Sequence, residues 1–122
     1  MARPGFQGLR VYVLSEAVAD TLWEVVMGWT PFARDAVGKQ LVRAADSIGA
    51  NIAEGSGRGT YQDNRRFVRI ARGSLNETIH FLRRAHRRHL VTPEQTAALK
   101  PLLDELAPKL NAYLKSIGPS KD

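Results

Sequence analysis

DAVGKQLVRAADSIGANIAEG, residues 35–55, carries the pattern from which the fold can be predicted. Its apolar residues recur at intervals of three and four, which is the spacing of one face of an α-helix. They are Val37, Leu41, Ala44, Ala45, Ile48 and Ile52. Small residues within this stripe would allow a neighbouring helix to approach closely. We therefore predict an amphipathic helix over 35–55 that packs against other helices.

A second helix is expected before this stretch, over residues 9–28. Its apolar residues follow the same spacing, and they are Val11, Leu14, Val18, Leu22 and Val25. Gly28 and Pro31 interrupt the pattern and mark a connection. We expect Phe32, in this connection, to pack beneath the other helices.

A third helix is expected after the glycine-rich segment 55–59, over residues 60–89. Asp63 falls in its first turn, where the helix dipole favours negative charge. The apolar stripe consists of Phe67, Ile70, Ala71, Leu75, Thr78, Ile79, Leu82 and Ala85. Gly73 lies within this stretch at a cost of about 1 kcal/mol relative to alanine, which suggests that a neighbouring helix packs closely there.

The last helix is expected over residues 93–117. Thr92 and Gln95 have the spacing of a capping box, and a proline occupies the first helical position. Pro101 and Pro108 interrupt the hydrogen-bond ladder, so a kink or a division into two pieces is expected. Four amphipathic helices with short connections predict an all-α protein, a single domain over 1–122 that folds as an antiparallel up-down four-helix bundle.

The composition limits the cellular setting. The 122 residues include no cysteine, so neither a disulfide framework nor a thiolate zinc site can form. No apolar run approaches the length that spans a membrane, and no signal segment is evident at the N-terminus. We expect a cytoplasmic protein without a membrane partner.

Positive charge is concentrated in one part of the chain. The formal net charge is +6, which favours a polyanionic partner. Nine arginines crowd a stretch that holds only two acids, and they are Arg58, Arg65, Arg66, Arg69, Arg72, Arg83, Arg84, Arg87 and Arg88. The first helix is acidic by contrast, with Glu16, Asp20 and Glu24. This asymmetry fits a surface for nucleic acid, or complementary faces that attract neighbouring subunits.

Two segments resemble a known family. QLVRAADSIGANIAEG, residues 40–55, and RFVRIARGSLNE, residues 66–77, resemble the two signatures of the bacterial four-helix bundle family known as 23S rRNA-intervening-sequence proteins. The resemblance implies an up-down bundle that assembles into a ring, typically a homopentamer. It also implies kinship with accessory variability proteins of diversity-generating retroelements, which are basic and pentameric and bind nucleic acid and a reverse transcriptase. The family name records a genomic location and is weak evidence for function.

Four polar residues in the signature segments form a candidate cluster. Asn51 and Glu54 lie beside the apolar stripe of one helix, and Ser74 and Glu77 flank Leu75 on the next. If the two helices run antiparallel, Asn51 can meet Ser74 or Glu77. Such a network would fix the helix register or line a functional pocket. Glu54 could alternatively pair with the arginine one turn later.

Motifs for catalysis or cofactors are weak. Glu77 and His80 have the Glu-x-x-His spacing of di-metal bundles, but only one copy exists. His86 and His89 lie among arginines that would repel a cation, so we expect a solvated basic surface. The segment 55–59 lacks the phosphate-loop pattern and is expected to end a helix. We expect no catalytic site, no metal and no cofactor.

The arginine pattern gives the leading functional hypothesis. Arg65, Arg69 and Arg72 follow i, i+4, i+7 spacing, and Arg84 and Arg88 follow i, i+4 spacing, so both sets project as stripes. Phosphate contacts require only such an array of cations. The hypothesis is a non-enzymatic homo-oligomer that binds the backbone of RNA or DNA. The alternative is a protein–protein scaffold or adaptor that binds another protein and no nucleic acid.

Overall fold

The computed structural model describes residue 3 and residues 5–119. Every regular element in these residues is helical, which confirms the all-α fold. In chain order the elements are η1 (Gly5–Gly8), α1 (Arg10–Met27), α2 (Pro31–Ala33), η2 (Arg34–Gly38), α3 (Lys39–Ser56), α4 (Tyr61–Arg87) and α5 (Pro93–Ser116).

The second long helix begins earlier than predicted. Thr30 caps it by accepting a hydrogen bond of 3.3 Å from the backbone N–H of Ala33, and Pro31 takes the first helical position. A proline there is favourable because that N–H has no partner within the helix. The start expected near residue 35 was therefore wrong. From Pro31 the chain continues through α2, the π-helical turn η2 and α3 without a break.

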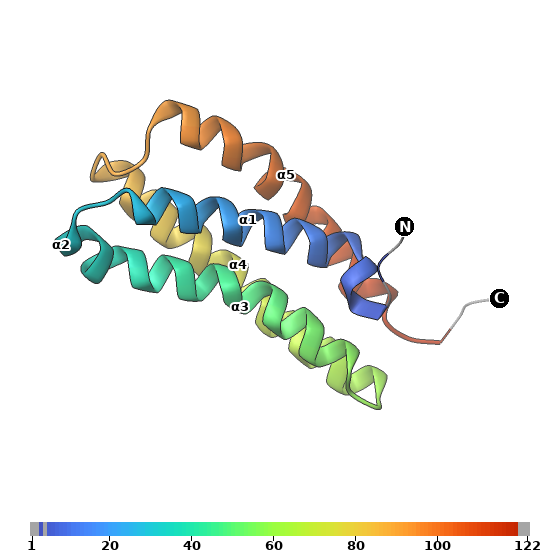
Figure 1. Ribbon diagram of the computed structural model, residues 1–122. Helices are drawn as coiled ribbons and strands as arrows, with labels where there is room; N and C mark the ends of the chain where they lie inside the picture. Colours follow the sequence, from blue (N-terminus) through green and yellow to red (C-terminus); the bar gives the residue numbers. More distant parts are fainter. Residues whose placement is uncertain (1–2, 4, 120–122) are drawn as a thin grey trace.

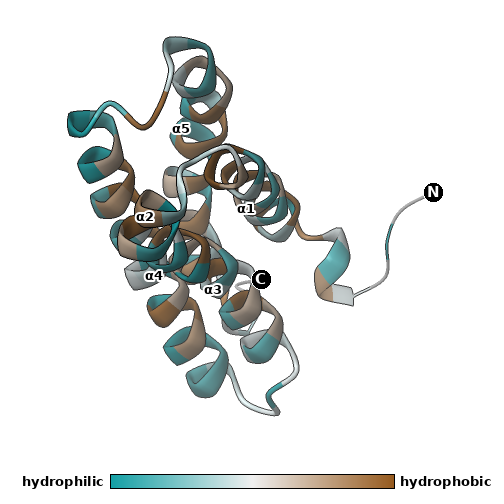
Figure 2. Ribbon diagram, turned by 60° about the vertical axis from the view of Figure 1, so that its left-hand side comes forward, coloured by the Kyte–Doolittle hydropathy of each residue, from teal (hydrophilic) through white to brown (hydrophobic). Residues whose placement is uncertain are grey.

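The long helices run alternately up and down, as Figure 1 shows. α3 packs against α1 and α4, and α5 packs against α1 and α4, so the four form a closed bundle. The contact between α3 and α4 is the most extensive, whereas α5 touches α4 less than it touches α1. Apolar and hydrophilic residues alternate around each long helix (Figure 2), as an amphipathic pattern requires.

The predicted stripes of α1 and α3 form the centre of the core, since all their apolar residues are buried. The stripe of α4 was only partly right. Val68 is fully buried, whereas Ile70 is 43% exposed. Phe67 is half-buried, and Ala71, Leu75, Thr78 and Ala85 lie in the core as expected.

Close helix approach occurs at glycines of α3. A Cβ atom added to Gly55 would lie 2.6 Å from Asn64 Oδ1 of α4, and one added to Gly49 would lie 2.9 Å from Ser15 Oγ of α1. At Gly73 an added Cβ would meet nothing within 4 Å. The expectation of close packing at Gly73 was therefore wrong, because this residue lies on the exposed side of α4.

Two further expectations about the connections and α5 are corrected. Phe32 is 82% exposed, and Trp29 fills the connection instead at 8% exposure. α5 is one undivided helix with Pro101 and Pro108 on its exposed side, so the expected division into two pieces was wrong, whereas the kink stays a prediction. Its capping box is present as predicted, because Thr92 and Gln95 exchange hydrogen bonds of 3.0 and 3.1 Å.

Among the described residues no helix has both the length and the apolar character needed to cross a bilayer.

Candidate nucleic-acid interface

Eight of the nine arginines lie on or directly after α4, and Arg58 lies in the turn before it. Because α4 turns its apolar stripe towards the core, its remaining faces carry the guanidinium groups outwards. All nine are exposed except Arg65, which is half-buried. The structure divides them into three groups that differ in their partners.

In the first group, the positive charge of each arginine is balanced by a carboxylate close to it in the sequence. Arg58 lies 3.6 Å from Glu54, and Arg66 lies 3.9 Å from Asp63. Both guanidinium groups also cover the ring of Phe67, with distances of 5.0 and 4.5 Å to its centroid. Cation–π contacts of this kind are stabilising. Phe67, predicted as a core residue, is therefore half-buried and lies beneath a layer of arginine.

The second group converges on one hollow between α4 and the end of α5. Arg65, Arg69 and Arg72 line it together with Lys115, and its volume is about 900 Å³. Arg65 Nη1 donates a hydrogen bond of 2.7 Å to the carbonyl oxygen of Ile117. Arg72 Nη1 lies 3.4 Å from Asn111 Oδ1. No carboxylate lines this hollow within the part of the chain that the structure describes.

The third group lies at the opposite end of α4. Arg83, Arg84, Arg87 and Arg88 form no ion pair with any described residue. Arg87 lines a shallow hollow with the exposed side chains of His86 and His89. The helix ends there in a Schellman arrangement, in which Leu90 N–H donates to Ala85 O and His89 N–H donates to His86 O. His89 has a φ of 60°, a left-handed conformation that usually favours glycine.

The polar cluster between α3 and α4 has Ser47 at its centre. Asn51 Nδ2 donates to the backbone oxygen of Ser47 at 2.8 Å and to its Oγ at 3.0 Å, and Ser74 Oγ donates to the same Oγ at 3.0 Å. Asn51 and Ser74 are thus joined through Ser47. Glu54 and Glu77 are exposed and lie outside the cluster. Sequence reasoning missed Ser47. Its position four residues before Asn51, on the same face of the helix, could have indicated it.

Glu77 and His80 lie on the solvent side of α4. The His80 ring packs edge-on against Phe81, with 5.1 Å between centroids. No three His, Cys, Asp or Glu side chains come together as a metal site among the residues that the structure describes. Within the described residues, Glu77 and His80 therefore have no second set of metal ligands beside them.

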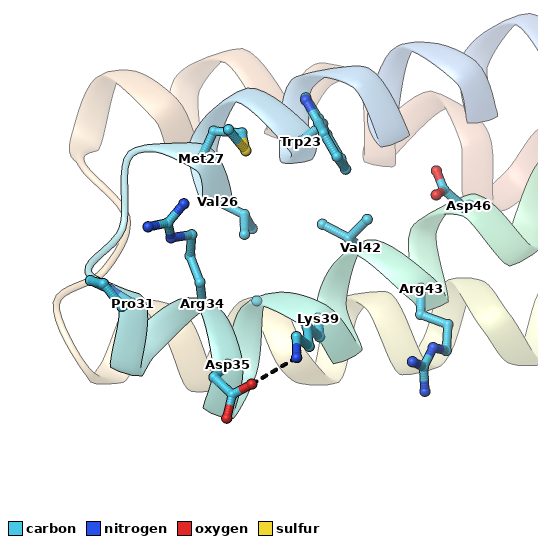
Figure 3. A pocket seen from close by; sticks show the side chains of 11 residues that line it. Trp23, Val26, Met27, Pro31, Arg34, Asp35, Lys39, Val42, Arg43 and Asp46 are labelled. Atoms are coloured by element: carbon cyan, nitrogen blue, oxygen red, sulfur yellow. Dashed lines mark ion pairs between the residues drawn. The ribbon is translucent and has the colours of Figure 1, made fainter.

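An apolar groove lies between α1 and α3, and sequence reasoning missed it. Trp23, Met27 and Val42 face this groove of about 630 Å³ (Figure 3). Trp23 is 52% exposed and Met27 is 51% exposed. The signal was the four-residue spacing of these two large residues, which places them together beside the core stripe of α1.

Carboxylates border this groove and the adjacent part of α1. Burial raises the pKa of Asp46, and the nearby carboxylate of Asp20 raises it further. Asp20, Glu24 and Asp46 have no ion-pair partner among the described residues, whereas Glu16 accepts a hydrogen bond of 2.8 Å from Arg3. Arg34, Lys39 and Arg43 also line the groove, so charges of both signs surround its apolar centre, whereas the outer faces of α4 are mainly basic.

Comparisons with known proteins agree with this architecture. A family described as 23S rRNA-intervening sequence protein matches residues 7–112. A solved structure from Bacteroides thetaiotaomicron, described as a protein with unknown function from the S23 ribosomal protein family, is similar at a TM-score of 0.75 and 25% identity. The match covers 87% of this chain and 99% of that chain. No curated protein matches the chain.

Proposed function

The chain belongs to the 23S rRNA-intervening sequence protein family, and on this premise we propose that it is a non-enzymatic homo-oligomer that binds the phosphate backbone of RNA or DNA. The ring of five subunits implied by the resemblance is part of this proposal. So is a cytoplasmic location, where such nucleic acids would be accessible.

One observation carries the proposal: the exposed faces of α4 hold arginines whose positive charge is not neutralised by any carboxylate of the described chain. Arg69, Arg83, Arg84, Arg87 and Arg88 make no ion pair there. Backbone phosphates are recognised by cations alone, without base contacts. Because these arginines lie on the outer faces of one helix and directly after its end, a phosphate backbone can contact several of them at once.

The groove lined by Trp23, Met27 and Val42 supports self-association. Two half-exposed large side chains side by side are typical of an interaction surface. Asp46, Arg34 and Arg43 border it without an ion-pair partner among the described residues, beside the ion pair of Asp35 and Lys39. A ring requires two different surfaces that fit each other, and in the proposed ring a second copy of this chain occupies the groove.

The same groove favours a second candidate function, a protein–protein scaffold or adaptor without affinity for nucleic acid. In that case the groove would take a different protein, and the arginines of α4 would serve solubility or subunit contacts. The two candidates differ in whether the isolated protein binds a polyanion.

Fluorescence polarisation with a labelled short RNA duplex tests the proposal. We expect binding that weakens steeply between about 50 and about 200 mM salt, because counterions are released from the phosphates. Absence of binding at the lower salt concentration, or binding indifferent to salt, would contradict the proposal and favour the scaffold.

Light scattering of the same sample tests self-association. We expect an oligomer for the unaltered protein and smaller species for Trp23→Glu, which places a charge in the apolar groove. Ala98→Glu is the matched control, because residue 98 lies on the exposed side of α5. A monomer for the unaltered protein would contradict the proposed ring.

A further inference from the structure

We infer that the hollow lined by Arg65, Arg69, Arg72 and Lys115, called here the arginine clamp, is the principal site for the phosphates of one nucleic-acid strand. This inference rests on the function proposed above and assigns it to one end of α4. Nucleic acid is thereby expected to bind at a defined place on the bundle, where two helices meet.

The position of the clamp follows from the topology. α4 begins at the end of the bundle where α5 finishes, as Figure 1 shows. Because α5 packs more extensively against α1 than against α4, the groove between α4 and α5 is open enough to hold the hollow. Cations from two helices thus converge on one concave place, whereas side chains on a convex helix surface diverge.

Two of the clamp arginines are held in place by uncharged acceptors. Arg65 donates to the backbone carbonyl of Ile117, and Arg72 contacts the side-chain oxygen of Asn111. A neutral acceptor orients a guanidinium group without cancelling its charge, in contrast to the carboxylates beside Arg58 and Arg66. Each guanidinium has five N–H groups, so most of the donors of Arg65 and Arg72 are left for a ligand. Orientation before binding reduces the entropy lost on binding.

The end of α5 opposes anion binding, and the clamp offsets that effect. The last carbonyl groups of a helix carry partial negative charge, equivalent to about half an elementary charge. Arg65 hydrogen-bonds to the carbonyl of Ile117, just after the last turn, and Lys115 lies within that turn. Arg69 and Arg72 therefore add positive charge beyond what the helix end neutralises.

The spacing of the clamp suits a phosphate backbone. Seven residues separate Arg65 from Arg72, which is about 10 Å along an α-helix. One strand of a duplex carries a phosphate about every 3.4 Å along the axis. When α4 lies along the duplex axis, the three arginines consequently span about three phosphate-to-phosphate intervals of one strand.

The other hollows of α4 lack this combination. The one at Arg83 is mainly apolar and includes the carboxylate of Asp104. The one at Arg87 contains a single arginine, beside His86 and His89. Of these three hollows the clamp has the largest number of Arg and Lys side chains, and no described carboxylate lines it.

The test compares two double variants that each remove two positive charges. Arg69→Ala with Lys115→Ala removes cations of the clamp that form no hydrogen bond or ion pair with described residues, so folding should be unaffected. Arg84→Ala with Arg88→Ala is the control at the other end of α4. Both are titrated against the labelled RNA duplex over a salt series, and thermal melting checks that each is folded.

We expect the clamp variant to bind about a hundredfold more weakly, about tenfold for each lost contact with a charged group. The slope of log K against log salt should fall by about 1.8 in magnitude, because two phosphate contacts are lost. The control removes two arginines that the proposed function also uses, so it should lose affinity as well, but much less than the clamp variant. Equal losses in both variants would overturn the clamp while leaving backbone binding in place, whereas an unaltered protein that does not bind would overturn the proposed function itself.

Asn111→Ala gives an independent measurement, because it frees Arg72 without changing the charge. We expect weaker binding with an unchanged salt slope, as for a residue that positions a cation. Unchanged affinity would contradict the argument that the clamp is oriented before binding.

Discussion

Trp29 Nε1 donates a hydrogen bond of 2.8 Å to the carbonyl oxygen of Leu90. These residues are 61 positions apart, and the bond joins the connection after α1 to the connection between α4 and α5. Trp29 is only 8% exposed, so its N–H and its aromatic surface both contribute to closing this end of the bundle.

Trp29→Phe should lower the free energy of unfolding by about 1–3 kcal/mol, because the Leu90 carbonyl loses its buried donor. Urea denaturation measures the change. Tyr61→Phe is the control, since Tyr61 is an aromatic residue that is 54% exposed and should respond little. Similar losses in both variants would mean that the hydrogen bond contributes nothing measurable.

Ser47→Ala should destabilise the fold by about 1–2 kcal/mol, because Asn51 and Ser74 both lose a partner between α3 and α4. A double-mutant cycle with Ser74→Ala should give a coupling energy of at least about 0.5 kcal/mol. Ser116→Ala controls for the loss of an exposed hydroxyl that bonds only within α5. Strict additivity in the cycle would show that the hydroxyl pair does not fix the register.

Gly73→Ala should stabilise the protein by about 1 kcal/mol, because alanine is the better helix former and its methyl group meets nothing within 4 Å. Gly55→Ala should destabilise it, since the added Cβ would lie 2.6 Å from Asn64 Oδ1. Thermal unfolding of the two variants compares an exposed helical glycine with a packed one. A stabilised Gly55→Ala variant would contradict the close approach of α3 and α4.

His89→Gly should stabilise the fold by about 1–2 kcal/mol, because a left-handed φ of 60° is costly for any residue with a Cβ atom. His86→Gly removes the same side chain from within α4 and should have the opposite effect. Comparing the unfolding curves of the two variants therefore distinguishes relief of backbone strain at His89 from the mere loss of a histidine side chain. Equal shifts in the same direction would argue against strain at His89.

Glu105→Gln should lower the melting temperature near neutral pH and have little effect in strong acid. Hydrogen bonds of 2.8 Å from Arg10 lower the pKa of Glu105, aided by the nearby charges of Arg10 and Lys109. A carboxylate with a lowered folded pKa stabilises the fold above its unfolded pKa, and that stability is lost as the pH falls through the folded pKa. Melting across the acidic range measures this, with Glu77→Gln as control, because Glu77 is exposed and forms no ion pair with a described residue. A difference from the unaltered protein that persists below pH about 2 would contradict it.

The sequence predicts the helices well where one face has an unambiguous pattern. In α1 and α3 each predicted apolar position is buried, and the capping box of α5 forms as expected. In α4 both Val68 and Ile70 are apolar, and local spacing cannot decide which of the two faces the core. Likewise, Trp29 and Phe32 are both aromatic, and only the position of Leu90 on a distant connection determines which is buried.

Only the part of the candidate site that lies on a single helix, α4, could be predicted from the sequence. The spacing of Arg65, Arg69 and Arg72 predicted that they project together, and they do line one hollow. Lys115 of α5 and Ile117 directly after it complete that hollow, about fifty residues later. Helical periodicity contains no information on how two helices are aligned. Ser47 was missed for the same reason, since its partner Ser74 belongs to another helix.

The π-helical turn at Arg34–Gly38 has an evolutionary consequence. Lys39 N–H donates to Arg34 O across five residues, so this turn holds one residue more than an α-helical turn would. The stripe from Leu41 onwards keeps its orientation because the extra residue is absorbed before it. A homologue whose corresponding helix is α-helical throughout should therefore align with this chain through a one-residue gap inside 34–38. The same insertion between Leu41 and Ile52 would rotate half of the stripe out of the core.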